Sequence, residues 1–211
     1  MEQGLKGALG LTGPEACLAY YRDWAASYDK GFARDMDYRL PAHVAAAFLG
    51  AGGTGPVLDV GAGTGLLAER LRDMGFADQI DAVDFSAEML ERAREKAIYT
   101  GLFRADITQP LDLPRRYGGI VSSGTFTAGH VGPVALPVLL DVALPGAQVA
   151  LSINRRVWVQ AGFDRALDDL ARSGRIDGLQ LIEVQVYGAA AAALDSDHAA
   201  DRAQIALFRA V

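Results

Sequence analysis

The sequence predicts one three-layer α/β domain built around a mostly parallel sheet. From position 56 onward, short apolar runs alternate with stretches whose apolar residues recur at helical spacing. The first of these runs leads directly into a glycine-rich segment at 61–65. Strands that alternate with helices form βαβ units, in which helices cover both faces of a parallel sheet. A length of 211 residues suits a single domain of this kind.

Seven strands are expected, each an apolar run bounded by turn-forming residues: 57–60, 80–85, 102–107, 118–124, 147–154, 179–187 and 204–211. A turn at 144–146 leads into the fifth strand. The last two strands have no long helical connection between them, so we expect that pair to be antiparallel. Helices are expected from capping residues and apolar stripes: 12–27, 41–49, 66–74, 87–97, one that opens at Gly132, and 159–172.

Charge and cysteine content narrow the function classes. The chain carries 20 Lys and Arg against 26 Asp and Glu, a formal charge of −6, whereas nucleic-acid binders usually present a basic surface. The N-terminus lacks a signal peptide, and no apolar stretch reaches the roughly 18 residues that span a bilayer. Cys17 is the single cysteine, and no set of His, Asp or Glu has metal-ligand spacing. We therefore expect a cytoplasmic protein that binds neither nucleic acid, membrane nor metal; its oligomeric state stays open.

The glycine-rich segment is the main functional signal. In a parallel α/β sheet, ligands bind outside the carboxyl ends of the strands, where this loop is expected to lie. Glycines at 61, 63 and 65 allow a tight turn and leave room for a ligand against bare backbone. The alternative is a loop that only makes a turn. A dinucleotide fingerprint would place its third glycine at Leu66, so the spacing disfavours a nucleotide-dependent oxidoreductase.

The segment VLDVGAGTGL, in which Asp59 stands two residues before the first glycine, resembles motif I of the class I S-adenosylmethionine-dependent methyltransferases. The resemblance covers most of the chain from Pro56 onward. It implies a Rossmann-like sandwich whose C-terminal strand is antiparallel, with S-adenosylmethionine as cofactor. It assigns donor contacts to five residues of this loop and strand: Asp59, Gly61, Ala62, Gly63 and Gly65.

Two further acidic positions extend the resemblance. Asp84 ends the second strand, 25 residues beyond Asp59, where a carboxylate can accept hydrogen bonds from both ribose hydroxyls. Phe85 would cover one face of the adenine. In the resembled family, an acid after the third strand binds the adenine amino group, and Asp106 and Ile107 match this site. The alternatives are a solvated strand-end acid or helix cap at 84 and a turn aspartate at 106.

The fourth strand departs from the family, because Gly119 stands where those enzymes often carry Asp. The resemblance still places Ser122, Ser123 and Gly124 beside the methionine end of the donor. Thr125 and Phe126 are expected on the substrate side.

The first fifty residues would form a helical lid over a core at 56–211, within one domain of 1–211. They resemble the small single-domain methyltransferases of the Williams–Beuren region type. On that resemblance Tyr28 and Tyr38 contact the donor and Trp24 the substrate. Aromatic residues at 20, 24 and 28 also have i, i+4 spacing, so plain helix packing is the alternative for Trp24 and Tyr28.

Methyl transfer from a sulfonium is an in-line displacement, so alignment in a dry pocket supplies most of the catalysis, and a base helps only where the nucleophile must lose a proton. His130, which follows the fourth strand, is the candidate base or substrate-orienting group; a capping or loop histidine is the alternative. The acidic charge and the absence of an Asn-Pro-Pro-Tyr-type segment favour a small, neutral or cationic acceptor. The alternative function is a donor-binding regulatory or scaffold protein without turnover.

Overall fold

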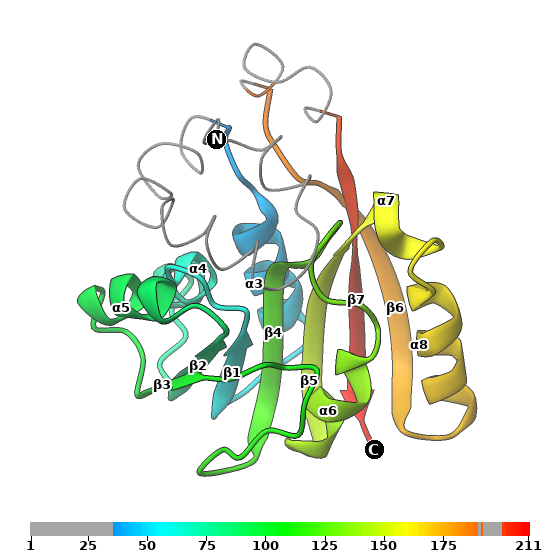
Figure 1. Cartoon of the computed structure of the whole chain (residues 1–211), viewed down its shortest axis with the longest axis horizontal. Helices are drawn as coiled ribbons and strands as arrows, with labels where there is room; N and C mark the ends of the chain where they lie inside the picture. Colours follow the sequence, from blue (N-terminus) through cyan, green and yellow to red (C-terminus); the bar gives the residue numbers. More distant parts are fainter. Residues whose placement is uncertain (1–35, 190, 192–199) are drawn as a thin grey trace.

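The computed structural model describes residues 36–189, 191 and 200–211. Its centre is one seven-stranded sheet with the strand order β3-β2-β1-β4-β5-β7-β6 (Figure 1). Strands β1 to β5 pair in parallel, whereas β7 pairs antiparallel with both β5 and β6. The strands are β1 (Val57–Val60), β2 (Ile80–Asp84), β3 (Gly101–Arg104), β4 (Tyr117–Phe126), β5 (Ala143–Asn154), β6 (Ile176–Gln185) and β7 (Arg202–Ala210). The predicted fold class, with an antiparallel strand at its C-terminal end, is confirmed.

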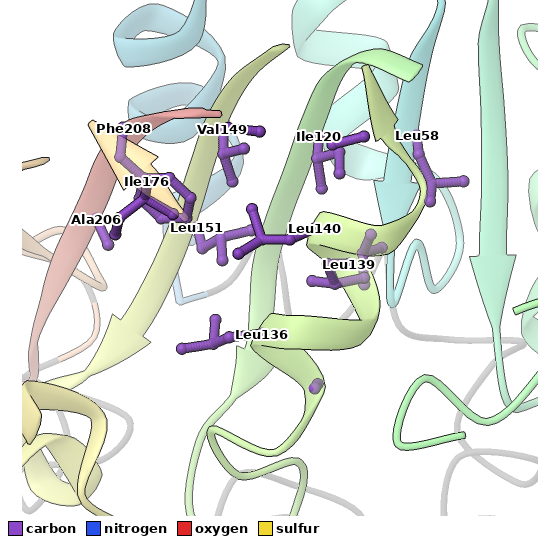
Figure 2. Packing of buried hydrophobic residues seen from close by; sticks show 14 of the residues in the cluster. Leu58, Ile120, Leu136, Leu139, Leu140, Val149, Leu151, Ile176, Ala206 and Phe208 are labelled. Atoms are coloured by element: carbon purple, nitrogen blue, oxygen red, sulfur yellow. The ribbon is translucent and has the colours of Figure 1, made fainter. Parts of the chain in front are cut away.

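Helices cover both faces of the sheet, and alternate strand residues face opposite layers. Leu58 packs with α6 and α8 on one face, while Val57 packs with α3 and α4 on the other. Figure 2 shows Leu139 and Leu140 of α6 lying over Ile120 of β4. The described helices are α3 (Leu40–Gly50), α4 (Leu66–Asp73), α5 (Ala87–Glu95), α6 (Ala135–Asp141), α7 (Arg155–Trp158) and α8 (Phe163–Arg172). Within the described ranges, no helix is long and apolar enough to cross a membrane.

Three predicted boundaries are wrong for local reasons. The helix expected at 159–172 begins at Phe163, because Gly162 before it adopts a left-handed backbone (φ +83°) and separates it from α7. The turn expected at 144–146 lies inside β5, where the pairing with β4 shifts between Tyr117 and Gly119. The third strand ends at Arg104 rather than at 107. The helix expected at 12–27 lies outside the described residues.

The topology brings the loops after β1, β2, β3 and β4 to one edge of the sheet. Strand β1 is central, with β2 on one side and β4 on the other, so the strand order reverses at β1. A ligand site is expected at such a reversal. Ser86 fixes one of these loops: its Oγ accepts a hydrogen bond from the Met89 backbone N–H (3.2 Å) and caps α5, as the sequence predicted.

Candidate functional site

A cavity of about 570 Å³ opens at this edge of the sheet. Its walls come from the loop after β1, the ends of β2 and β3, the segment 123–134 after and within β4, and Tyr38, which precedes α3. Cavities of this size hold drug-sized ligands. Ten of the residues predicted for the site line it: Tyr38, Gly61, Ala62, Gly63, Asp84, Phe85, Asp106, Ile107, Thr125 and His130.

The three glycines of the loop all adopt left-handed backbone, with φ between +55° and +91°. They differ in what surrounds them. A Cβ on Gly61 would overlap the Thr125 side chain, and a Cβ on Gly65 would lie 3.0 Å from the Tyr99 ring, whereas a Cβ on Gly63 would meet nothing within 4 Å. Two glycines are therefore needed for packing within the protein, and Gly63 leaves open space at the cavity.

Asp84 ties the glycine loop to the end of β2. Its Oδ2 accepts a hydrogen bond from the Gly63 backbone N–H, and its Oδ1 accepts one from the Ser86 backbone N–H, both at 2.8 Å. Burial raises the pKa of Asp84, and these two backbone donors oppose that rise. Each carboxylate oxygen can accept more than one hydrogen bond, so the group keeps acceptor capacity toward the cavity that it lines.

The next wall of the cavity follows β3. Asp106 Oδ1 accepts hydrogen bonds from the backbone N–H (2.9 Å) and the hydroxyl (2.7 Å) of Thr108, which makes the turn that the alternative interpretation expected. The same residue lines the cavity, so the turn and a binding role are compatible. Ile107 is buried beside it, and Phe85, 37% exposed, lies on the wall that β2 contributes.

His130 lies on the wall formed by the segment after β4. Its Nδ1 is 2.8 Å from the Ala128 carbonyl oxygen; this contact assigns the proton to Nδ1 in the neutral ring and leaves a lone pair on Nε2. Burial lowers the pKa of His130, more than the hydrogen bond to Ala128 raises it. The imidazole is therefore in its neutral, proton-accepting form at pH 7.

Tyr38 reaches the cavity from the other side of β4. It forms an isolated antiparallel bridge with Tyr187, and the two rings lie 5.8 Å apart. Its hydroxyl packs onto the Gly124 backbone, where a Cβ would lie only 2.5 Å away. Gly124 itself has a φ of +81°, so this close contact requires glycine for two reasons.

Four residues predicted for the site do not line the cavity. Phe126 is fully buried and packs edge-on against Phe163, outside the cavity lining, so its substrate contact stays a prediction without support from this geometry. Ser122 is also buried; its hydroxyl donates to the Val60 carbonyl oxygen (2.7 Å). Asp59 and Gly65 lie behind the glycine loop, against Tyr99. Trp24 and Tyr28 lie outside the described residues, and their contacts stay predictions.

Of the three residues predicted at the methionine end of the donor, Ser123 and Gly124 line the cavity and Ser122 does not. The two-residue period of a strand was the available signal, because Ile120 and Ser122 then share the inward face. Tyr99 was missed entirely, and no local pattern marks it. Among the described residues, no group of three or more His, Cys, Asp or Glu side chains could hold a metal ion.

Known proteins resemble this chain in sequence and in fold. A family model described as a methyltransferase domain matches residues 57–144. Human methyltransferase-like protein 27 is 32% identical over 185 residues, which cover 83% of this chain and 74% of the human protein. The chain belongs to the class I S-adenosylmethionine-dependent methyltransferases. Its cofactor is accordingly S-adenosylmethionine.

Solved methyltransferase structures have the same fold at lower sequence identity. The methyltransferase CcbJ from Streptomyces caelestis superposes with a TM-score of 0.62 at 18% identity, over 90% of this chain and 98% of that chain. DhpI, solved with S-adenosylhomocysteine, gives a TM-score of 0.61 at 21% identity, over 92% of this chain and 94% of that chain.

The cavity of this methyltransferase fits its donor. The open space at Gly63 leaves main chain exposed to a ligand, and Asp84 and Asp106 supply acceptors for hydroxyl and amino groups. Phe85 and Ile107 offer apolar surface for a base. A nucleoside with two hydroxyls, an amino group and a flat ring is chemically matched by this set.

Proposed function

We propose that this methyltransferase transfers a methyl group from S-adenosylmethionine to a small-molecule acceptor bound in the same cavity. The observation that carries the proposal is that a single cavity of about 570 Å³ contains both groups of residues. The glycine loop and Asp84 line it together with Thr125, His130 and Tyr38. Donor and acceptor can therefore meet in it without a second site.

The donor half of the cavity is assigned by complementarity. Asp84 accepts hydrogen bonds from the ribose hydroxyls, and Asp106 accepts from the adenine amino group. Phe85 and Ile107 sandwich the ring. Main chain at Gly61 to Gly63 lies against the part of the donor next to the ribose, where Gly63 has no side chain to obstruct it.

The acceptor half favours a neutral or cationic compound. The ionisable residues that line the cavity in the described ranges are Tyr38, Asp84, Asp106 and His130, and none of them is a lysine or an arginine. Within the described ranges, a carboxylate or phosphate on the acceptor would therefore find no cationic side chain in the cavity, and the two carboxylates of the donor half would repel it. Thr125 and Tyr38 offer hydroxyl groups that can orient an acceptor.

His130 is the proposed proton acceptor. The bound donor supplies an activated methyl group and a neutral sulfur leaving group. As the acceptor's hydroxyl or amine forms its bond to the methyl carbon, the carbon–sulfur bond breaks and its electron pair stays on sulfur. His130 Nε2 takes the proton that the nucleophile loses. The contact of Nδ1 with the Ala128 carbonyl (2.8 Å) fixes the tautomer that this step requires.

The division into a lid at 1–50 and a core at 56–211 within one domain also stays a proposal. Its described part is α3, which packs on the sheet through Val44 and Phe48, and Tyr38 just before α3 lines the cavity. Both features support a role for this segment in closing the site. The cytoplasmic location expected from the sequence likewise remains a prediction.

The test has a binding step and a turnover step. Calorimetry should show micromolar binding of S-adenosylmethionine and S-adenosylhomocysteine but not of NAD, and Asp84→Ala should weaken donor binding at least tenfold. A metabolite library is then incubated with isotope-labelled donor, and products are detected by mass spectrometry.

His130→Gln separates the catalytic role from the structural one. The variant should bind donor within twofold of the original protein while its turnover of a hydroxyl or amine acceptor falls about 10²-fold or more, the usual contribution of general acid–base catalysis. Unchanged turnover would remove His130 from the mechanism. Donor binding without any labelled product would favour the alternative, a donor-binding regulatory or scaffold protein.

A further inference from the structure

Tyr99 lies on the far side of the glycine loop from the cavity. It belongs to the connection between α5 and β3, and its hydroxyl donates a hydrogen bond to Asp59 Oδ2 at 2.7 Å. Its ring packs onto the Gly65 backbone, where a Cβ would lie 3.0 Å from the ring carbon Cε2. Tyr99 therefore contacts the residues on both sides of the loop, although it does not line the cavity.

Asp59 joins the end of β1 to the start of α4. Gly65 is the N-cap residue of α4 and has no side chain with which to cap it. Asp59 supplies that function from the strand, because its carboxylate accepts a hydrogen bond from the Ala68 backbone N–H in the first turn of α4. The loop at 61–65 connects these two anchored ends, so the position of the Asp59 carboxylate helps to set the loop's shape.

Several charged groups surround Asp59. The carboxylate is 1% exposed, and Asp84 of β2 is a like charge nearby. On α4, Glu69 forms a 2.7 Å ion pair with Lys96 at the end of α5, which fixes the segment that carries Tyr99. Tyr99 and the Ala68 N–H are the donors that favour the ionised carboxylate.

These surroundings perturb both members of the pair. The pKa of Asp59 is raised to about 7: burial is the largest cause, the Tyr99 hydroxyl opposes the rise, and the Asp84 carboxylate adds to it. Burial and the neighbouring carboxylate raise the pKa of Tyr99 well above its ordinary value. The phenol thus keeps its proton near neutral pH and remains a donor, while Asp59 titrates in the range in which enzymes work.

We propose that Tyr99 is a positioning residue for the methyl donor: its hydroxyl holds the Asp59 carboxylate beneath the glycine loop, and through Asp59 it maintains the loop shape that receives the donor. The inference rests on the donor site described under the proposed function. It adds a residue that never touches the donor but controls how donor binding responds to pH.

The experiment measures S-adenosylhomocysteine affinity by calorimetry from pH 6 to pH 9. In the original protein, affinity should fall as pH decreases through about 7, because Asp59 becomes protonated. Tyr99→Phe keeps the ring and removes the hydroxyl. Loss of one hydrogen bond to a charged group should move the midpoint of this fall upward by about one to two pH units. The variant should bind about five- to fiftyfold more weakly at pH 7 and come within about twofold of the original protein at pH 9.

The protein contains a matched control. Tyr117 donates a 3.0 Å hydrogen bond to Asp81 Oδ2. This second buried Tyr–Asp pair joins β4 to β2, and its Tyr117 packs in the core on the opposite face of the sheet from Tyr99. Tyr117→Phe should leave affinity within twofold at every pH, whatever it does to stability. Asp59→Asn has no carboxylate to titrate, so its affinity should no longer vary through this pH window, and adding Tyr99→Phe should not restore a midpoint.

Three outcomes would overturn the inference. Tyr99→Phe could weaken binding equally at all pH values, which indicates a packing role alone. The Tyr117 variant could show the same midpoint shift, or Asp59→Asn could keep the original pH profile. A failure of the proposed donor site looks different, because the unsubstituted protein would then not bind S-adenosylhomocysteine at any pH.

Discussion

Replacing Gly61 and Gly63 separately by alanine should affect different properties of the protein. In Gly61→Ala, an L residue must adopt a φ of +62°, which costs about 1–2 kcal/mol. The new methyl also overlaps Thr125, with Cγ2 at 2.8 Å and Cβ at 3.0 Å. Thr125 cannot rotate away freely, because its hydroxyl is bonded to the Val60 carbonyl (3.1 Å) and to the Ser122 hydroxyl (2.9 Å).

The magnitude follows from these contacts. Breaking two hydrogen bonds of about 1 kcal/mol each, added to the backbone term, gives a loss of about 3–4 kcal/mol for Gly61→Ala. In a chain of 211 residues, each kcal/mol lowers Tm by about 2–4 °C. Gly63→Ala has a φ of +55° but open space around the methyl, so only the backbone term of about 1–2 kcal/mol applies. Its methyl instead takes up space beside the donor.

Thermal unfolding followed by circular dichroism, together with calorimetry of donor binding, measures both effects. Gly61→Ala should melt about 6–16 °C lower, and Gly63→Ala should lose at least tenfold in donor affinity with a smaller change in Tm. Gly146→Ala is the control, because Gly146 has a φ of +80° and open space around it in β5. This variant should lose about as much stability as Gly63→Ala and keep its donor affinity. Equal Tm losses for Gly61→Ala and Gly63→Ala would refute this reasoning. So would a loss from Gly61→Ala that is no smaller in a Thr125→Ala background, where only the backbone term should remain.

Two other substitutions test the interior. Phe126→Ala should reduce the free energy of unfolding by about 3–5 kcal/mol, measured in urea, because the ring is fully buried against Phe163; a variant that keeps its stability but loses acceptor affinity would return Phe126 to the site. Asp59→Asn tests the perturbed carboxyl. Folded Asp59 keeps its proton up to about pH 7, against 3.8 for an ordinary Asp, so the native state binds more protons between these values and this group's stabilisation declines as pH rises. The free energy of unfolding is measured for both proteins at pH 4 and pH 7.5. Between these values, Asp59→Asn should gain about 4 kcal/mol of stability relative to the original protein. Parallel pH curves for the two proteins would contradict the raised pKa of Asp59.

The sequence was most informative where the signal is local. Period-two alternation places Val57 and Leu58 in opposite layers, and the glycine spacing at 61–65 locates the edge of the sheet where the cavity lies. The position of Asp84 could also be predicted, because the end of a strand and the cap of the next helix are set by residues close together in the sequence. These signals predicted the fold and the edge of the sheet at which the cavity lies.

The remaining errors concern contacts between distant segments. Asp59 is separated from Tyr99 by 40 residues along the chain, and nothing near either residue indicates that a phenol meets this carboxylate. Phe126 was expected just after the fourth strand, but it is the last residue of β4, and its side chain packs inward against Phe163 of α8. Such preferences are decided by tertiary packing, which a linear pattern does not encode.

The position of β7 has a consequence for synthesis on the ribosome. Strand β6 forms its whole ladder with β7, yet β7 follows it in the chain and sits between it and β5 (Figure 1). A nascent chain therefore exposes β6, with Leu181 and Ile182 still outward-facing after folding, before any partner strand has emerged. Until residues 202–210 leave the exit tunnel, the sheet stops at β5, and both β5 and β6 offer unpaired main-chain groups to other chains. Once β7 has emerged, it pairs with β5 and with the inner edge of β6, and β6 remains the edge strand of the sheet.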